Sequence, residues 1–243
     1  KGRDRANPPP TIRPAGAGPL PATLPSGALT EHEAKALLGA YGIRTTREVL
    51  ARSADDAVAA AGSIGWPVVL KGVSRAIVHK SDIGLVHLDI KDEAALRSAF
   101  ASIIEVVDHH AHGTLEGVLV EEMGMGAAEV FLGAKYDPAF GPMVLAGIGG
   151  VLVEALGDVR MACAPIAPAD ARALFGGLEL HLLLTGLRGR PQADMNAAVD
   201  ALVRLSWLVV DLGPRLVELD VNPLILGPAG LGAIAVDARA TLA

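Results

Sequence analysis

Helical and strand patterns follow one another along this chain in an irregular order, and this order limits the possible folds more than any other feature. Apolar residues recur at helical spacing in residues 30–41, 53–64, 92–107, 168–175 and 193–212. Short apolar runs typical of strands occupy residues 68–73, 86–90, 117–123, 129–136, 143–146, 216–221 and 232–236. Because these segments do not alternate as βαβ units would, the sequence predicts an α+β fold with largely antiparallel sheets.

The composition supports a packed core and argues against several partners. Of the 243 residues, 51% are hydrophobic and 20% are charged, so the chain is long and apolar enough to bury a core. A net charge of -6, without a basic stripe, argues against nucleic acid as a partner. The uncharged stretch 138–153 holds two prolines and is shorter than the roughly 20 residues that a membrane-spanning helix needs, so we expect no membrane partner.

The first 28 residues differ in composition from the rest. Residues 1–28 are rich in proline and glycine and lack apolar periodicity, which predicts a linker. The chain begins at Lys1 rather than methionine, which suggests a fragment or a processed protein. The single cysteine, Cys163, excludes an internal disulfide and is typical of a reducing cytoplasm, and its apolar neighbours predict a buried thiol.

The first candidate site is a lysine followed by a polar loop. Lys71 ends an apolar strand pattern, and the loop His79–Gly84 separates it from the next one. A buried ammonium is costly unless an anionic group meets it, and backbone N–H groups of a glycine-containing loop can bind phosphate. This pattern suggests a cradle for nucleotide phosphates. An edge-strand lysine beside an ordinary polar hairpin is the alternative.

The second candidate is the acidic end of the strand pattern at residues 117–123. Glu121 lies near its end, and Glu129 opens the next strand pattern. Backbone groups at such a strand end can meet the edge of a purine, and a carboxylate can bind ribose hydroxyls. The alternative is a solvated strand end with ordinary charges.

The third candidate is a group of hard oxygen donors near the end of the chain. Asp220 and Asn222 stand in the segment Glu218–Leu224, and Asp237 follows the last predicted strand. Mg²⁺ prefers oxygen ligands and usually takes one or two protein groups together with phosphates. The pattern is therefore compatible with a magnesium site at the ends of two neighbouring strands, or with an Asn-Pro turn and a surface aspartate.

In this order, these features resemble the ATP-grasp domain of the ADP-forming acetyl-CoA synthetases and their acyl-CoA relatives. The β subunit of succinyl-CoA synthetase is a more distant relative. The resemblance runs from Leu29 to the end of the chain through LTEHEAKALLGAYGI, WPVVLKGVS, HKSDIG, GVLVEEM, AAEVFLGAKYDPAFGP, GIGGVLVE, APIAP, LLTGLRG and ELDVNPL with AVDAR. The most specific of these motifs are HKSD and the D-x-NP segment with its later aspartate.

This resemblance implies an ATP-grasp fold, in which an N-terminal lobe (residues 29–123) and a C-terminal lobe (residues 124–243) clasp a nucleotide. The cofactor-binding residues that it implies are Lys71, Lys80, Ser81 and Gly84 for the phosphates, Glu121 and Met123 for adenine, and Glu129 for ribose. The metal ligands that it implies are Asn222 and Asp237.

The resemblance also implies a reaction. The complete enzyme would interconvert an acid, CoA and ATP with acyl-CoA, ADP and phosphate in the cytoplasm, using Mg²⁺. The implied partner is a subunit or domain that binds CoA and carries the principal phosphohistidine, which Asp220 would face. His79 would itself carry the phosphoryl group, because imidazole is largely neutral near pH 7 and nucleophilic at nitrogen.

One departure from the family pattern leaves other functions open. Family members usually have two glycines after the HKSD loop, whereas Gly84 is followed by Leu85 here, which is expected to stiffen the loop. A regulatory module of a protein acyltransferase, which binds nucleotide without catalysis, is one alternative. A non-catalytic scaffold for the CoA-binding partner is another.

Overall fold

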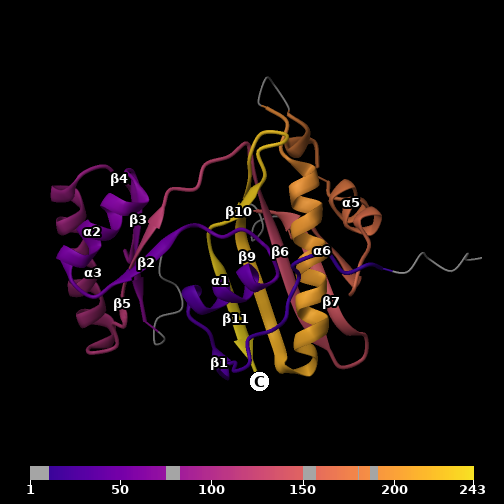
Figure 1. Cartoon of the computed structure of the whole chain (residues 1–243), viewed down its shortest axis with the longest axis horizontal. Coiled ribbons are helices and arrows are strands. Elements are labelled where there is room, and N and C mark those ends of the chain that lie inside the picture. Colours follow the sequence, from indigo (N-terminus) through magenta and orange to yellow (C-terminus); the bar gives the residue numbers. More distant parts are fainter. Residues whose placement is uncertain (1–10, 75–82, 150–156, 180, 187–190) are drawn as a thin grey trace, which may run out of the picture.

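The computed structural model describes residues 11–74, 83–149, 157–179, 181–186 and 191–243. It confirms the predicted α+β class, because helices pack on two antiparallel sheets that form two neighbouring units (Figure 1). We call the described residues between 48 and 122 the small unit. The large unit comprises residues 11–43 and the described residues from 124 onward.

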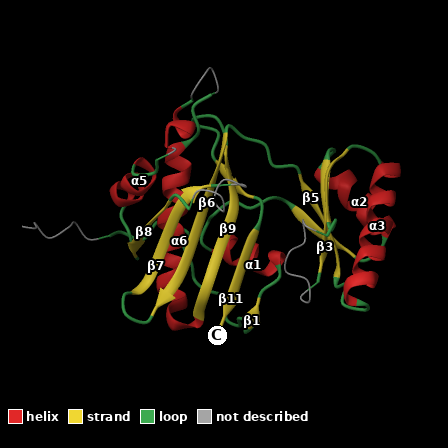
Figure 2. Ribbon diagram, turned by 180° about the vertical axis from the view of Figure 1, so that it is seen from behind, coloured by secondary structure: helices red, strands yellow, loops and turns green. Residues whose placement is uncertain are grey.

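The small unit is a four-stranded sheet covered by two helices. Its strand order is β2 (Glu48–Ala51), β5 (Gly117–Glu122), β3 (Val68–Val73) and β4 (Val86–Ile90). Helices α2 (Ala54–Ile64) and α3 (Glu93–Ala111) lie on its outer side (Figure 2), and the side chains of Ser53 and Asp92 cap their first turns. The other face of this sheet is turned toward the large unit (Figure 2).

Leu85, which stands where the family pattern has a second glycine, is a core residue of the small unit. Its side chain is fully buried, whereas Gly84 is exposed and has a left-handed φ of 81°. A Cβ on Gly72 of β3 would lie 3.3 Å from Cδ2 of Leu85, so the leucine fills the space beside the glycine. The leucine that replaces the second glycine of the family pattern therefore contributes to the packing of the core beside β3.

We expect Leu85→Ala to lower the free energy of unfolding by about 2–5 kcal/mol, because it leaves a cavity in a closely packed core. Urea unfolding followed by circular dichroism measures this change. Leu88→Ala on β4 is the matched control, since Leu88 is exposed and its truncation should change stability by less than about 0.5 kcal/mol. Equal losses in the two variants would contradict the packing role of Leu85.

The large unit is built on a seven-stranded sheet. Its main strand order is β1 (Gly27–Ala28), β11 (Ala238–Leu242), β9 (Leu216–Leu226), β6 (Ala128–Asp137), β7 (Gly141–Ile148) and β8 (Val159–Cys163), and β10 (Ala233–Ala235) pairs with β9. Helices α1 (Glu31–Ala40), α5 (Pro168–Gly176) and α6 (Met195–Leu212) lie on one face. In the described part of the chain, no helix covers the opposite face, which we call the open face (Figure 2).

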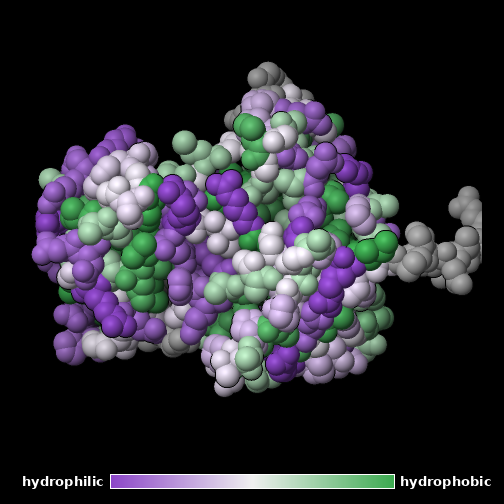
Figure 3. Space-filling model, viewed as in Figure 1, coloured by the Kyte–Doolittle hydropathy of each residue, from purple (hydrophilic) through white to green (hydrophobic). Residues whose placement is uncertain are grey.

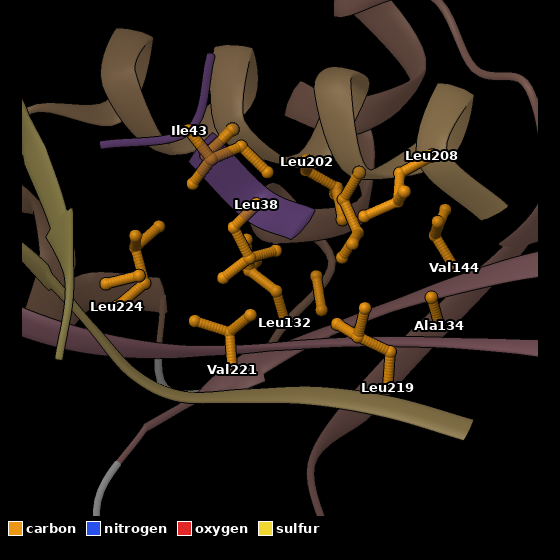
Figure 4. Close-up of a cluster of buried hydrophobic side chains, with 14 of the residues drawn as sticks. Leu38, Ile43, Leu132, Ala134, Val144, Leu202, Leu208, Leu219, Val221 and Leu224 are labelled. Carbon is orange, nitrogen blue, oxygen red and sulfur yellow. The ribbon is translucent and has the colours of Figure 1, made fainter. Parts of the chain in front are cut away.

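Helix α1 packs in the large unit, although the expected lobe 29–123 included it. Leu38 and Ile43 lie with Leu132 and Val221 between the large sheet and α6 (Figure 4). The structure therefore divides the chain differently from the sequence-based expectation. The large unit takes both ends of the described chain because the apolar face of α1 is buried against this sheet rather than against the small one.

The described segment 11–28 also packs on the large unit, which differs from the linker expected at residues 1–28. Arg13 donates to both carboxylate oxygens of Asp211 on α6, at 2.8 and 2.6 Å. Its guanidinium also lies 4.6 Å from the ring centroid of Trp207, and β1 pairs with β11. A composition rich in proline and glycine limits regular structure, but it does not prevent such tertiary contacts.

The predicted helices are all present, and the main differences concern strands. Strands β1, β2, β8 and β11 were not predicted, and β9 continues through Asn222 and Pro223 to Leu226. The prediction of a buried thiol at Cys163 is wrong, because β8 is an edge strand and its last residue is exposed.

Within the described ranges, no helix is both long enough and apolar enough to cross a bilayer. The outer rim of the small unit is largely hydrophilic on the side shown in Figure 3.

Asp194 fixes the start of α6 and the turn after β9 together. Its carboxylate accepts hydrogen bonds from the backbone N–H groups of Gly232 at 2.9 Å, Gly230 at 3.0 Å and Ala197 at 3.1 Å. The bond from Gly232 contributes most to holding the pKa of Asp194 below its ordinary value. One carboxylate thus caps the helix and holds the loop that leads to β10.

We expect Asp194→Ala to lower the free energy of unfolding by about 1–2 kcal/mol at pH 7, as for loss of a strong N-cap. The folded state lowers the pKa of this carboxyl, so its contribution is complete above about pH 5 and is lost as the pH falls through the folded-state pKa. Urea unfolding at pH 7 and at stepwise lower pH measures the difference. Asp200→Ala on the exposed side of α6 is the control for the loss at pH 7 and should be less destabilising there than Asp194→Ala. A constant difference for Asp194→Ala down to about pH 2 would contradict the role of its carboxylate.

Candidate nucleotide site between the two units

Lys71 and Glu121 lie on the face of the small sheet that is turned toward the large unit. In the β3–β5 pairing, Lys71 is opposite Leu119 and Glu121 is opposite Val69. Their neighbour Leu70 belongs to the core beneath α2 and α3, so alternation along the strand directs Lys71 to the opposite face. The predicted phosphate and adenine residues therefore meet at the junction of the two units.

The Lys71 ammonium is enclosed by oxygen atoms of the chain itself. Its Nζ donates to Oε1 of Glu31 at 2.7 Å and to the carbonyl oxygen of Val236 at 2.9 Å, and it lies 2.7 Å from Oε2 of Glu121. The first two contacts are hydrogen bonds, and the third is an ion-pair contact. The anionic partners that a buried lysine requires are thus Glu31 of the large unit and Glu121 of the small unit.

A second buried lysine shares these carboxylates. Nζ of Lys35 on α1 lies 2.8 Å from Oε1 of Glu31, 2.8 Å from Oε1 of Glu121 and 2.9 Å from Oε2 of Glu48. It also donates to Oγ1 of Thr46 at 3.0 Å, and that hydroxyl donates a short hydrogen bond to Glu121. The network therefore joins α1 of the large unit to β2 and β5 of the small unit.

Both lysines are held in the charged form. Burial by itself lowers the pKa of Lys71, but the neighbouring carboxylates outweigh this effect and raise its pKa above the ordinary value. Burial and the charge of Lys71 likewise oppose protonation of Lys35, and the three glutamates again raise its pKa. Two ammonium groups thus lie among three carboxylates in this buried network.

The same three carboxylates have a spacing that a metal ion also uses. One oxygen each of Glu31, Glu48 and Glu121 lies within 4.8 Å of the others. Nζ of Lys35 contacts all three residues, so this cluster is an ion-pair network rather than a metal centre.

The predicted magnesium ligands lie next to this network. Asn222 of β9 donates its backbone N–H to the carbonyl oxygen of Asp237 at 3.2 Å, which brings the two residues together. Asp237 also adjoins Lys71, because the preceding residue Val236 accepts the lysine's hydrogen bond. An amide oxygen and a carboxylate are ligands that Mg²⁺ accepts, so the donor set of Asn222 and Asp237 fits the predicted ion.

Asp220 lies two residues before Asn222 on the open face of the large sheet. It pairs in register with Arg239 of β11 and with Gly133 of β6. Burial and the carboxylate of Glu218 raise the pKa of Asp220, and the guanidinium of Arg239 opposes that rise. The half-buried Asp220 therefore shares a sheet face with Asn222, the predicted magnesium ligand of the same strand.

The residues predicted to hold adenosine are spread along the connection between the units. The Glu121 side chain is fully buried in the ion network, which leaves only its backbone for an adenine contact. Met123 follows β5 and is half-buried. A Cβ on Gly126 would lie 2.4 Å from Cγ2 of Ile225, so the segment between β5 and β6 packs closely against β9. Glu129 is exposed and pairs with Ile225, about 10 Å along the strand from Asn222.

Some of the predicted residues have no described position. His79, Lys80 and Ser81 lie outside the described residues, and Gly84 is exposed just after that gap. The roles that the family resemblance implies for these four residues stay predictions.

Sequence reasoning missed Glu31, Lys35 and Glu48. In the sequence, Glu31 and Lys35 look like ordinary residues of a capped helix, whose predicted capping box of Thr30 and Glu33 is confirmed. A signal was available, because Glu31, Lys35 and Leu38 recur at helical spacing on the apolar side of α1. Charged residues within an apolar stripe indicate partners from another element.

Comparison with protein families gives a match over most of the chain. The family model described as an ATP-grasp domain matches residues 23–242. The β subunit of an ADP-forming acetate–CoA ligase (II) from Pyrococcus furiosus is 39% identical over 216 residues, which cover 88% of this chain and 92% of that subunit. The ADP-forming acetate–CoA ligase I of Archaeoglobus fulgidus is 39% identical over 86% of this chain, which spans only 30% of that protein.

Solved structures show the same relationship. An acetyl-coenzyme A synthetase 1 of Ca. Korarchaeum cryptofilum, in complex with coenzyme A and Ca-AMPCP, has a TM-score of 0.85 and 40% identity over 89% of this chain and 94% of that one. A structure of that synthetase with coenzyme A and Mg-AMPPCP, in which the phosphohistidine segment points towards the nucleotide-binding site, has a TM-score of 0.78 and 38% identity. It covers 89% of this chain and 93% of the matched one.

Proposed function

This chain belongs to the ATP-grasp domain family, and from that premise we propose that it is the nucleotide-binding component of an ADP-forming acid–CoA ligase. It transfers a phosphoryl group from ATP to a histidine, or from a phosphohistidine to ADP, while a partner carries out the CoA-dependent steps. The observation that carries this proposal is the junction of the two units, where Lys71 lies beside the oxygen donors Asn222 and Asp237. A cation and hard oxygen ligands are what a nucleoside polyphosphate needs.

We assign the phosphate end of the nucleotide to this junction. Lys71 binds a phosphate oxygen from β3, and Asn222 and Asp237 hold Mg²⁺. That ion, when bound, neutralises and orients the phosphates. The backbone of Glu121 and Met123 holds adenine where β5 leaves the small unit, and Glu129 binds ribose from β6.

The reaction itself needs little from the protein beyond position and charge. In ATP formation, the P–N bond of a phosphohistidine breaks as an ADP oxygen forms a P–O bond, and the imidazole returns to its neutral form. Asp220, on the open face beside Asn222, orients this imidazole by accepting a hydrogen bond from its second ring nitrogen. His79 serves as a second carrier of the phosphoryl group in this proposal.

The CoA-binding and principal phosphohistidine functions belong to a partner. The chain matches a β subunit over almost its whole length and only part of a single-chain ligase, so these functions lie on another chain or another domain. The related proteins are ligases, which favours this function over a regulatory module of a protein acyltransferase.

Calorimetric titration of the protein with ADP, with and without Mg²⁺, tests the proposal. We expect one site per chain and an affinity that rises when Mg²⁺ is present, because Asn222 and Asp237 then share the ion with the phosphates. Absence of ADP binding under both conditions, also after addition of the CoA-binding partner, would overturn it.

A further inference from the structure

The contacts of Lys71 raise a problem for nucleotide binding. Three oxygens of the chain already lie within 2.9 Å of its Nζ, two as hydrogen-bond acceptors and the third, Oε2 of Glu121, in ion-pair contact. A phosphate can bind this ammonium only if one of these oxygens gives up its contact. This question rests on the proposed function, in which Lys71 binds a nucleotide phosphate.

The three oxygens differ in the partners that each would keep after losing its contact with Lys71. Among the described residues, Oε2 of Glu121 has no partner other than Lys71, so it would become a buried unpaired oxygen. By contrast, Oε1 of Glu31 is shared, since it lies 2.7 Å from Nζ of Lys71 and 2.8 Å from Nζ of Lys35. Among the described residues, Oε1 of Glu31 is therefore the one of these three oxygens that itself contacts a second ammonium, whereas Lys35 contacts Glu121 through its other oxygen, Oε1.

The environment of Lys35 suits it to retain its contact with Glu31 and does not leave its ammonium accessible to a ligand. Its side chain is 2% exposed, and its Nζ is surrounded by Glu31, Glu48, Glu121 and Thr46. These contacts come from both units and leave the ammonium enclosed. It can therefore keep the charge of Glu31 compensated while Lys71 turns away.

We propose that Lys35 is a positioning residue for nucleotide binding, which retains the Glu31 carboxylate so that the Lys71 ammonium can exchange this contact for a phosphate oxygen. Glu31 is then the internal competitor of the phosphate. The two residues act on Lys71 with opposite sign: loss of Lys35 strengthens the hold of Glu31, and loss of the Glu31 charge weakens it.

The test compares ADP with adenosine, which lacks the phosphates. Calorimetry gives the affinity of each ligand for the parent protein and for Lys35→Met and Glu31→Gln, with Mg²⁺ present. We expect the ratio of ADP affinity to adenosine affinity to fall about 10-fold in Lys35→Met and to rise in Glu31→Gln, as expected for one buried charge near the phosphate. Exposed Lys91→Met and Glu93→Gln are matched controls and should leave the ratio unchanged.

The outcomes separate the inference from the proposed function. Equal losses for ADP and adenosine in Lys35→Met would mean that Lys35 only stabilises the fold, and would overturn the inference. A lower ratio in Glu31→Gln would also overturn it, and this second variant decides the matter if Lys35→Met does not fold. Absence of ADP binding by the parent protein would instead overturn the proposed function and the inference with it.

Discussion

Lys71→Met should destabilise the protein and slow phosphoryl transfer. The substitution removes one ammonium from a buried network and leaves Oε2 of Glu121 without its cation. Removing one member of a buried ion pair costs about 3–5 kcal/mol, so we expect a loss of that size in the free energy of unfolding. Urea unfolding measures the stability, and turnover with the CoA-binding partner present measures the second effect, for which we expect a loss of more than about 2 kcal/mol in transition-state stabilisation.

Two further variants identify the cause of the Lys71→Met effect. Adding Glu31→Gln should restore part of the stability, because it removes one of the carboxylates that Lys71 had compensated. Lys91→Met, at an exposed ion pair on the surface, should leave the free energy of unfolding close to that of the parent. Stability within about 1 kcal/mol of the parent in Lys71→Met would show that the network does not depend on this ammonium.

Asp237→Ala should remove the Mg²⁺-dependent part of ADP affinity and slow turnover by a factor of about 30 or more, equivalent to about 2 kcal/mol. Its carboxylate is the only charged oxygen donor in the proposed magnesium pair with Asn222. Titration with ADP at several Mg²⁺ concentrations, together with the turnover assay, measures both effects.

The exposed residue Asp55 provides the control for this prediction. Its side chain is 86% exposed on α2, so Asp55→Ala should bind ADP and turn over like the parent. Unchanged Mg²⁺ dependence in Asp237→Ala would place the metal ligands elsewhere. An equal loss of ADP affinity with and without Mg²⁺ would mean that Asp237 maintains the structure of the junction and does not bind the ion.

The sequence was sufficient to predict helices and strands where a cap or an apolar run marks them. The capping box of Thr30 and Glu33 begins α1, and the apolar runs at residues 68–73 and 86–90 are strands with those bounds. Strands β8 and β11 were missed, since their residues are partly exposed or small and give no continuous apolar run. The family motifs, not the periodicity, predicted the ATP-grasp fold.

The sequence also determined that Lys71 needs an anionic partner, because burial of an unpaired ammonium is too costly. Only the tertiary structure decided which partner it has. Glu31 is 40 residues away in the chain and Val236 is 165 residues away, and no local pattern connects them to β3. The packing of α1 against the large sheet brings Glu31 and Lys35 to the junction, so the network depends on the arrangement of the two units and cannot be deduced from any one segment.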